Sequence, residues 1–79
     1  MDTAVLVDAG WVSVPYKGDE FARIELAVGD QTDWYPAYRD WSSGGVRVVK
    51  IRPPAGRAGP SIVWLKVDGH VTQLGHVTL

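Results

Sequence analysis

The chain has 79 residues, with nine acidic side chains, eight basic ones and no cysteine. A chain of this length accommodates one domain, 1–79, and so small a domain buries only roughly 60 % of its unfolded surface. Disulfides, thiolate metal sites and thiol nucleophiles are all excluded without cysteine. We therefore expect assembly with copies or partners to support a marginal core.

The first residues do not have the pattern of an export signal. Met1 and Asp2 lead into Thr3–Val7 without a basic start or a long apolar run. The apolar runs elsewhere are a few residues long, far below the ~20 needed to span a bilayer. We expect a protein made in a cytoplasm, with no signal peptide and no membrane partner.

Charge is distributed unevenly along the chain. Residues 1–45 contain eight acidic and three basic side chains, whereas residues 46–79 contain five basic and one acidic side chain. Such polarity would suit head-to-tail packing of identical copies. The alternative, which we favour, is that strands of the two halves interleave in the folded sheet, so that their opposite charges are mixed and the net electrostatic field is small.

Short runs rich in Val, Ile, Trp and Tyr, separated by Gly, Pro or Asp, predict strands joined by turns. In the first part of the chain these are a strand over Thr3–Val7, a turn at Asp8–Gly10, a strand over Trp11–Val14 stopped by Pro15, and a turn at Lys17–Asp19.

The segment Phe21–Val28 shows the clearest alternation. One side of an extended chain would carry Ala22, Ile24, Leu26 and Val28, and the other Arg23 and Glu25. A helix is the competing interpretation, but Gly18 and Gly29 bracket only ten residues, so we favour a strand.

Glycine and proline residues separate the expected strands in the middle of the chain. Trp34–Trp41 contains Pro36 and is expected to be an edge strand or an ordered loop, because proline cannot donate to a central ladder. The remaining expectations here are a polar turn at 29–33, a turn at Ser42–Gly45, a strand over Val46–Arg52 and a loop over Ala55–Pro60.

The last segment predicts a two-residue hairpin. Asp68-Gly69 lies between Ser61–Val67 and His70–Leu74, and this dipeptide favours the positive φ angles of a type I′ turn. Val67 should then face His70, Leu65 should face Thr72, and Gly75 should bend the chain. Six to seven short, mostly antiparallel strands indicate an all-β fold, either a small β-sandwich or a partly open barrel.

Few residues are suited to metal binding or acid–base chemistry. His70 and His76 lack a third ligand at metal spacing, so we interpret them as exposed strand residues. The aspartates Asp30, Asp33 and Asp40 do not match a calcium loop and indicate solvated turns. Glu20 and Glu25 are a weak acid/base pair in the manner of glycosidases, one in a turn and the other on a polar strand face.

Nucleophile and phosphate motifs are missing as well. No nucleophile elbow surrounds Ser42 and Ser43, and Gly56–Pro60 lacks the strand-to-helix context of a phosphate loop. We therefore predict a protein that is not an enzyme and needs no cofactor or metal.

Aromatic residues exceed what one small core can bury. Four tryptophans, three tyrosines and one phenylalanine occur, and each large ring takes about 150 to 250 Å². We expect Trp11 and Trp64 in the core, and a contact surface formed by Trp34, Tyr35, Tyr38 and Trp41. Because acidic residues flank this cluster, we expect a protein partner before a sugar, and no nucleic acid.

The stretch Trp34–Leu79 resembles small virion proteins, of the minor tail or capsid-accessory type, from tailed bacteriophages that infect actinobacteria. The matching features are Trp34-Tyr35-Pro36, Gly44-Gly45, the hairpin segment Val63–Gly69 and the final Val77-Thr78-Leu79. Similar Trp-x-x-Val-x-Gly segments recur in β-hairpins of that family, although the family commonly has another Trp just after the Gly, where this chain has His70-Val71.

The resemblance implies a non-enzymatic virion component, such as a minor tail, tail-tip or capsid decoration protein, that binds copies of itself or other virion proteins. The expected interface residues are Trp34, Tyr35, Tyr38 and Trp41, with Arg47, Lys50, Arg52 and Arg57 as the opposing charged surface. The alternative is a small carbohydrate-binding module for host-surface glycans, with Trp34, Tyr38 and Trp41 as platform and Asp33 or Asp40 as hydrogen-bond partner.

Overall fold

The computed structural model describes residues 5–41, 47–54, 56 and 58–79, and they form eight strands and no helix. The strands are β1 (Leu6–Asp8), β2 (Trp11–Pro15), β3 (Ile24–Val28), β4 (Tyr35–Pro36), β5 (Tyr38–Asp40), β6 (Val48–Ile51), β7 (Pro60–Val67) and β8 (His70–Thr78). The predicted turn at Ser42–Gly45 and the predicted interface residue Arg57 lie outside the described residues.

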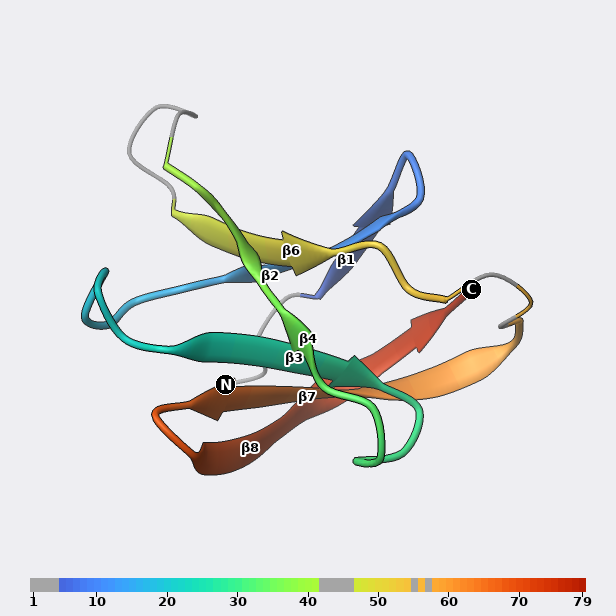
Figure 1. Ribbon diagram of the computed structural model, residues 1–79. Coiled ribbons are helices and arrows are strands. Elements are labelled where there is room, and N and C mark those ends of the chain that lie inside the picture. Colours follow the sequence, from blue (N-terminus) through green and yellow to red (C-terminus); the bar gives the residue numbers. More distant parts are fainter. Residues whose placement is uncertain (1–4, 42–46, 55, 57) are drawn as a thin grey trace.

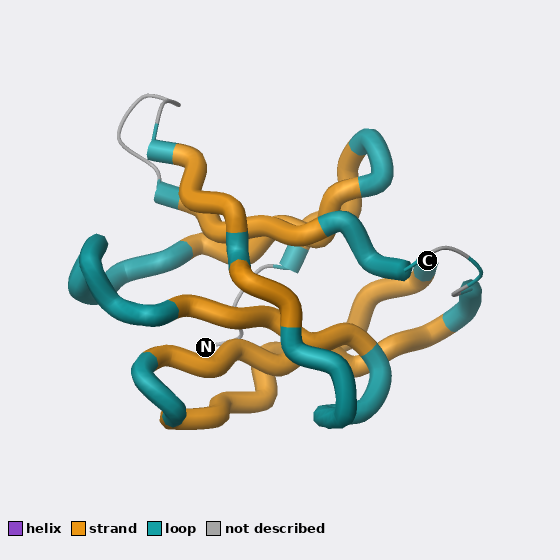
Figure 2. Tube along the Cα trace, in the orientation of Figure 1, coloured by secondary structure: helices purple, strands orange, loops and turns teal. Residues whose placement is uncertain are grey.

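The strands build two antiparallel four-stranded sheets, one with the order β1-β2-β6-β5 and the other with the order β4-β3-β7-β8. We call them sheet A and sheet B. They lie one above the other as two layers (Figures 1 and 2), which is the β-sandwich alternative of the predicted all-β fold.

The core lies between the sheets because each central strand alternates. In β2, Val12 and Val14 are fully buried while their neighbours are half-buried, and β6 repeats this pattern with Val49 and Ile51. From sheet B come Ile24, Leu26, Val28, Val63 and Val77.

The predicted strand Phe21–Val28 is confirmed only from Ile24 onward. Its inward set from Ala22 to Val28 is buried as expected, but residues 20–22 form a turn and a bend, and Phe21 is 83 % exposed. Asp19 explains the late start, since its carboxylate accepts the backbone N–H of Phe21 at 2.9 Å and its carbonyl accepts that of Ala22 at 3.2 Å.

In both two-residue hairpins the turn residues have the left-handed backbone conformation. Asp68 and Gly69 have φ of 49° and 85°, and the predicted pairs Val67 with His70 and Leu65 with Thr72 are confirmed. The first hairpin turns at Ala9 and Gly10, with φ of 51° and 81°, so Asp8 belongs to β1.

Gly75 does not interrupt the last strand. Strand β8 continues to Thr78, and a register shift opposite Val63 and Trp64 leaves Leu74 as the extra residue of a bulge.

The segment Trp34–Trp41 divides between the two sheets. Strand β4 is an edge of sheet B and β5 is an edge of sheet A, and only Ala37 separates them. The backbone N–H of Ala37 donates to the carbonyl of Ile24 at 3.0 Å. Arg39 of β5 donates to the carbonyls of Glu20 (2.6 Å) and Ala22, in the segment that leads into β3 of sheet B. One side of the sandwich is therefore closed by a continuous piece of chain, as Figure 1 shows.

Candidate binding surface

The outward face of sheet A carries aromatic and cationic side chains together. Because Val12 and Val14 point into the core, Trp11 points outward from β2. The same alternation in β6 turns Lys50 outward between Val49 and Ile51. Tyr38 of β5 lies directly opposite Lys50 and is 59 % exposed.

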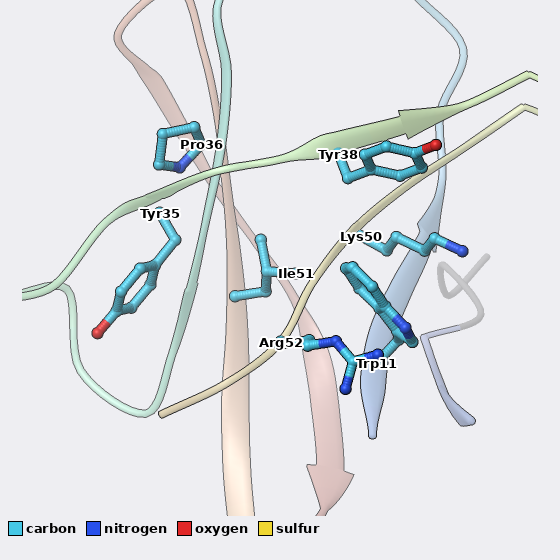
Figure 3. A pocket seen from close by; sticks show the side chains of 7 residues that line it. All are labelled: Trp11, Tyr35, Pro36, Tyr38, Lys50, Ile51 and Arg52. Atoms are coloured by element: carbon cyan, nitrogen blue, oxygen red, sulfur yellow. The ribbon is translucent and has the colours of Figure 1, made fainter. Parts of the chain in front are cut away.

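These side chains surround an open hollow of about 300 Å³, lined by Trp11, Tyr35, Pro36, Tyr38, Lys50, Ile51 and Arg52. We call it the aromatic–cationic hollow. Figure 3 shows Ile51 between Tyr35 on one side and Trp11, beside Arg52, on the other, with Pro36 and Tyr38 along the upper edge. Tyr35 and Pro36 come from sheet B whereas Trp11 and Tyr38 come from sheet A, so the hollow spans the crossing of the chain between the layers.

Two cations lie against the Trp11 ring. The Arg52 guanidinium carbon is 4.6 Å and the Lys50 ammonium 4.9 Å from its centroid. Lys50 also lies 5.6 Å from the Tyr38 ring, which is itself 6.0 Å from Trp11 and tilted by 44°. Each such cation–π contact contributes about 0.5–1 kcal/mol at an exposed site, so these contacts favour the clustered arrangement in the free chain.

An acidic side chain limits the positive charge of this face. Lys50 Nζ lies 3.3 Å from Asp40 Oδ2, and both side chains are about four-fifths covered. Arg52 is exposed, and no ion pair of Arg52 occurs among the described residues. The guanidinium of Arg52 is therefore the cation best placed to meet an acidic group of a partner.

The structure brings together four of the predicted interface residues, namely Tyr35, Tyr38, Lys50 and Arg52. The charged residues were expected to oppose the aromatic ones, and instead Lys50 and Arg52 share their face. Cross-strand pairing causes this, because β6 lies beside β5 on one side and β2 on the other.

The remaining predicted interface residues lie elsewhere. Trp34 lies on the outer side of sheet B, where Lys66 Nζ is 4.2 Å from its ring. Trp41 packs against the core and stacks on the buried Tyr16 at 6.2 Å, with Arg47 5.4 Å from its ring. The glycan platform of Trp34, Tyr38 and Trp41 is thus divided among three places.

The expectation that Trp11 and Trp64 lie in the core was wrong. Both are half-buried on outer faces, and the buried aromatic ring is that of Tyr16, which is 6 % exposed. Trp64 lies opposite Ala27 and donates its indole N–H to the carbonyl of Gly29 at 3.0 Å.

A signal for this outward placement was present in the sequence. In an extended strand, alternate residues lie on the same face. Trp11 therefore shares a face with Ser13 and Pro15, and Trp64 shares one with Lys66. The apolar residues Val12, Val14 and Val63 lie on the opposite faces. The polar residues of each set identify the solvent-facing side.

The histidines are exposed on β8, as predicted, and no group of three or more His, Asp or Glu side chains that could hold a metal ion occurs in the described part of the chain. Nor does that part contain a helix long and apolar enough to cross a membrane.

Comparison with known proteins gave no match to a family model, to a curated protein or to a solved structure.

Proposed function

We propose that this chain is a non-enzymatic structural component of a tailed-phage particle, and that its aromatic–cationic hollow docks an acidic surface of a neighbouring virion protein. The observation that carries this proposal is the clustering of Trp11, Tyr38, Lys50 and Arg52 around an open hollow. The resemblance of Trp34–Leu79 to small virion proteins supports the assignment to a phage.

The chemistry of the hollow fits a protein partner. Tryptophan, tyrosine and arginine are the residue types that dominate protein interfaces energetically, because they bury a large area at low entropic cost. Tyr38 and Arg52 are exposed, whereas Lys50 is engaged with Asp40. An acidic partner would therefore gain its apolar contact from Tyr38 and its orientation from Arg52.

Two observations favour this function over glycan binding. A sugar-binding platform needs an open aromatic face, and both Arg52 and Lys50 lie against the ring of Trp11. The three aromatics of the predicted platform do not share one surface either. Glycan binding is accordingly the opposing outcome of the test below.

The test is incorporation into particles. A phage deleted for this gene would be complemented with the wild-type chain or with Tyr38→Ala or Arg52→Ala, and copies per purified particle counted by quantitative mass spectrometry. Removing the ring or the guanidinium should lower incorporation at limiting expression about tenfold, equivalent to ~1.4 kcal/mol. Phe21→Ala is the matched control, because Phe21 is an exposed ring outside the hollow.

Absence of the wild-type chain from purified particles would refute the virion assignment. Wild-type copy numbers for both hollow variants would refute docking through the hollow. Binding to a glycan array that Tyr38→Ala abolishes, with no chain in the particle, would establish the carbohydrate-binding alternative.

A further inference from the structure

Strand β8 forms an outer edge of sheet B. It has nine residues and pairs with β7 alone among the described strands. Its first four residues, His70 to Gln73, are all exposed, whichever face of the sheet they occupy. This is the segment before the bulge at Leu74, so it is a regular strand, and no described residue pairs with its second side.

The hydrogen-bond parity shows which backbone groups point away from β7. The backbone N–H of Asp68 donates to the carbonyl of Arg23, just before β3, so Asp68 bonds toward β3. Its neighbour Val67 therefore bonds in the opposite direction, toward β8, and forms a hydrogen-bonded pair with His70. Alternation along an antiparallel pair then turns the N–H and C=O of Val71 and Gln73 outward.

Beyond the bulge the alternation resumes, shifted by the one extra residue. Leu79 and Gly59 exchange two backbone hydrogen bonds of 3.1 Å, so Leu79 and Val77 bond toward β7. His76 and Thr78 therefore point their backbone groups outward, and β8 offers a row of donors and acceptors.

The other three edges carry features that discourage strand pairing. β4 has two residues, one of them Pro36. β5 has three residues, including the charged Arg39 and Asp40, and β1 has three and ends in Asp8. Shortness, proline and charge are the usual protection of a sheet edge against association.

β8 has none of these three features. No Lys, Arg, Asp, Glu or Pro occurs from His70 to Thr78. The apolar side chain of Val71 is 38 % exposed, and β1, which approaches β8, exposes Leu6 at 61 % and Val7 at 45 %. An uncharged, exposed edge beside apolar side chains is typical of a strand that is paired in the assembled state.

We propose that β8 pairs antiparallel with β8 of a second copy, joining two copies of sheet B into one continuous sheet across a twofold axis. A second copy fits this edge because a strand without charges can lie against itself without placing like charges opposite each other. The contact uses His70–Gln73, where the backbone is regular. This contact lies on sheet B, so the proposed dimer is separate from the proposed function, which uses the hollow.

The measurement is the solution mass of the purified chain by light scattering over a concentration series. Wild type should approach twice the mass of one chain. Gln73→Lys places a positive charge on both strands and should raise the dimer dissociation constant at least tenfold. Gln31→Lys is the matched control, because Gln31 is an exposed glutamine in the turn between β3 and β4.

Amide hydrogen exchange identifies the contact itself. In the dimer the amides of Val71 and Gln73 should exchange at least tenfold more slowly than in dilute protein, while Thr72, which bonds to β7, should be protected in both. Tyr38→Ala should dimerise as wild type does, which separates this contact from the hollow.

A chain that stays monomeric at all concentrations would overturn the proposal, as would a dimer that Gln73→Lys leaves unchanged. Rapid exchange of Val71 and Gln73 in a proven dimer would also overturn it, because the contact would then lie elsewhere.

Discussion

Replacing Gly18 by alanine should destabilise the sandwich through one buried ring. A Cβ at this position would lie 2.6 Å from Tyr16 Oη and 2.8 Å from Cζ. Tyr16 is 6 % exposed, its hydroxyl donates to the Asp19 carbonyl at 2.8 Å, and its ring stacks on Trp41. The new methyl group thus meets a side chain that is held on several sides.

The magnitude follows from these contacts. Relief requires the ring to move by roughly 1 Å, and overpacking of a close-packed core costs typically about 1–3 kcal/mol. If the movement breaks the hydroxyl bond to Asp19, about 0.5–1.5 kcal/mol is lost in addition. We expect Gly18→Ala to lower the free energy of unfolding by about 2–4 kcal/mol, a large part of the total for a small domain.

Urea unfolding followed by tryptophan fluorescence measures this change. The control is Gly75→Ala, because a Cβ on Gly75 has no heavy atom within 4 Å and Gly75 has no positive φ. It should leave stability within about 1 kcal/mol of wild type. Combining Gly18→Ala with Tyr16→Phe should recover part of the loss, since the nearest clashing atom is removed. A change below about 0.5 kcal/mol for Gly18→Ala would refute the reasoning.

Three further changes should alter stability by the mechanisms described above. Ala9→Asn should raise the melting temperature by a few degrees, because asparagine adopts a left-handed turn conformation at lower cost than alanine; calorimetry showing no gain would contradict this. Arg39→Ala should cost about 1–3 kcal/mol in urea unfolding, since it removes the donor to the carbonyls of Glu20 and Ala22, whereas Arg39→Lys should recover only part. Trp64→Phe should cost about 1–2 kcal/mol because the Gly29 carbonyl loses its indole donor, and an unchanged unfolding midpoint would exclude that bond.

The all-β class and the C-terminal hairpin could be predicted because their signals are local. Asp68-Gly69 specifies its turn directly, and the registry of Val67 with His70 follows from the turn. The alternation from Ala22 to Val28 likewise identifies the buried face without knowledge of the partner strands.

The hollow could be predicted only in part because it depends on non-local pairing. Trp11 and Tyr38 are far apart in sequence and meet because β2 and β5 both flank β6. Strand order cannot be read from one sequence, so Lys50 and Arg52 were expected on a charged surface opposing the aromatic one. Instead both lie against Trp11, and Lys50 also lies near Tyr38. The burial of Tyr16 depends in the same way on its stacking against Trp41.

The crossing of the chain at Ala37 links binding to folding. Tyr35 and Pro36 belong to sheet B and Tyr38 to sheet A, so a partner seated in the hollow holds residues of both layers at once. Separation of the layers would dismantle the hollow, and occupancy at a hundred times the dissociation constant would add about 2.7 kcal/mol to the stability of the native state. A domain with a core this small would then reach its full resistance to heat and proteolysis only after docking.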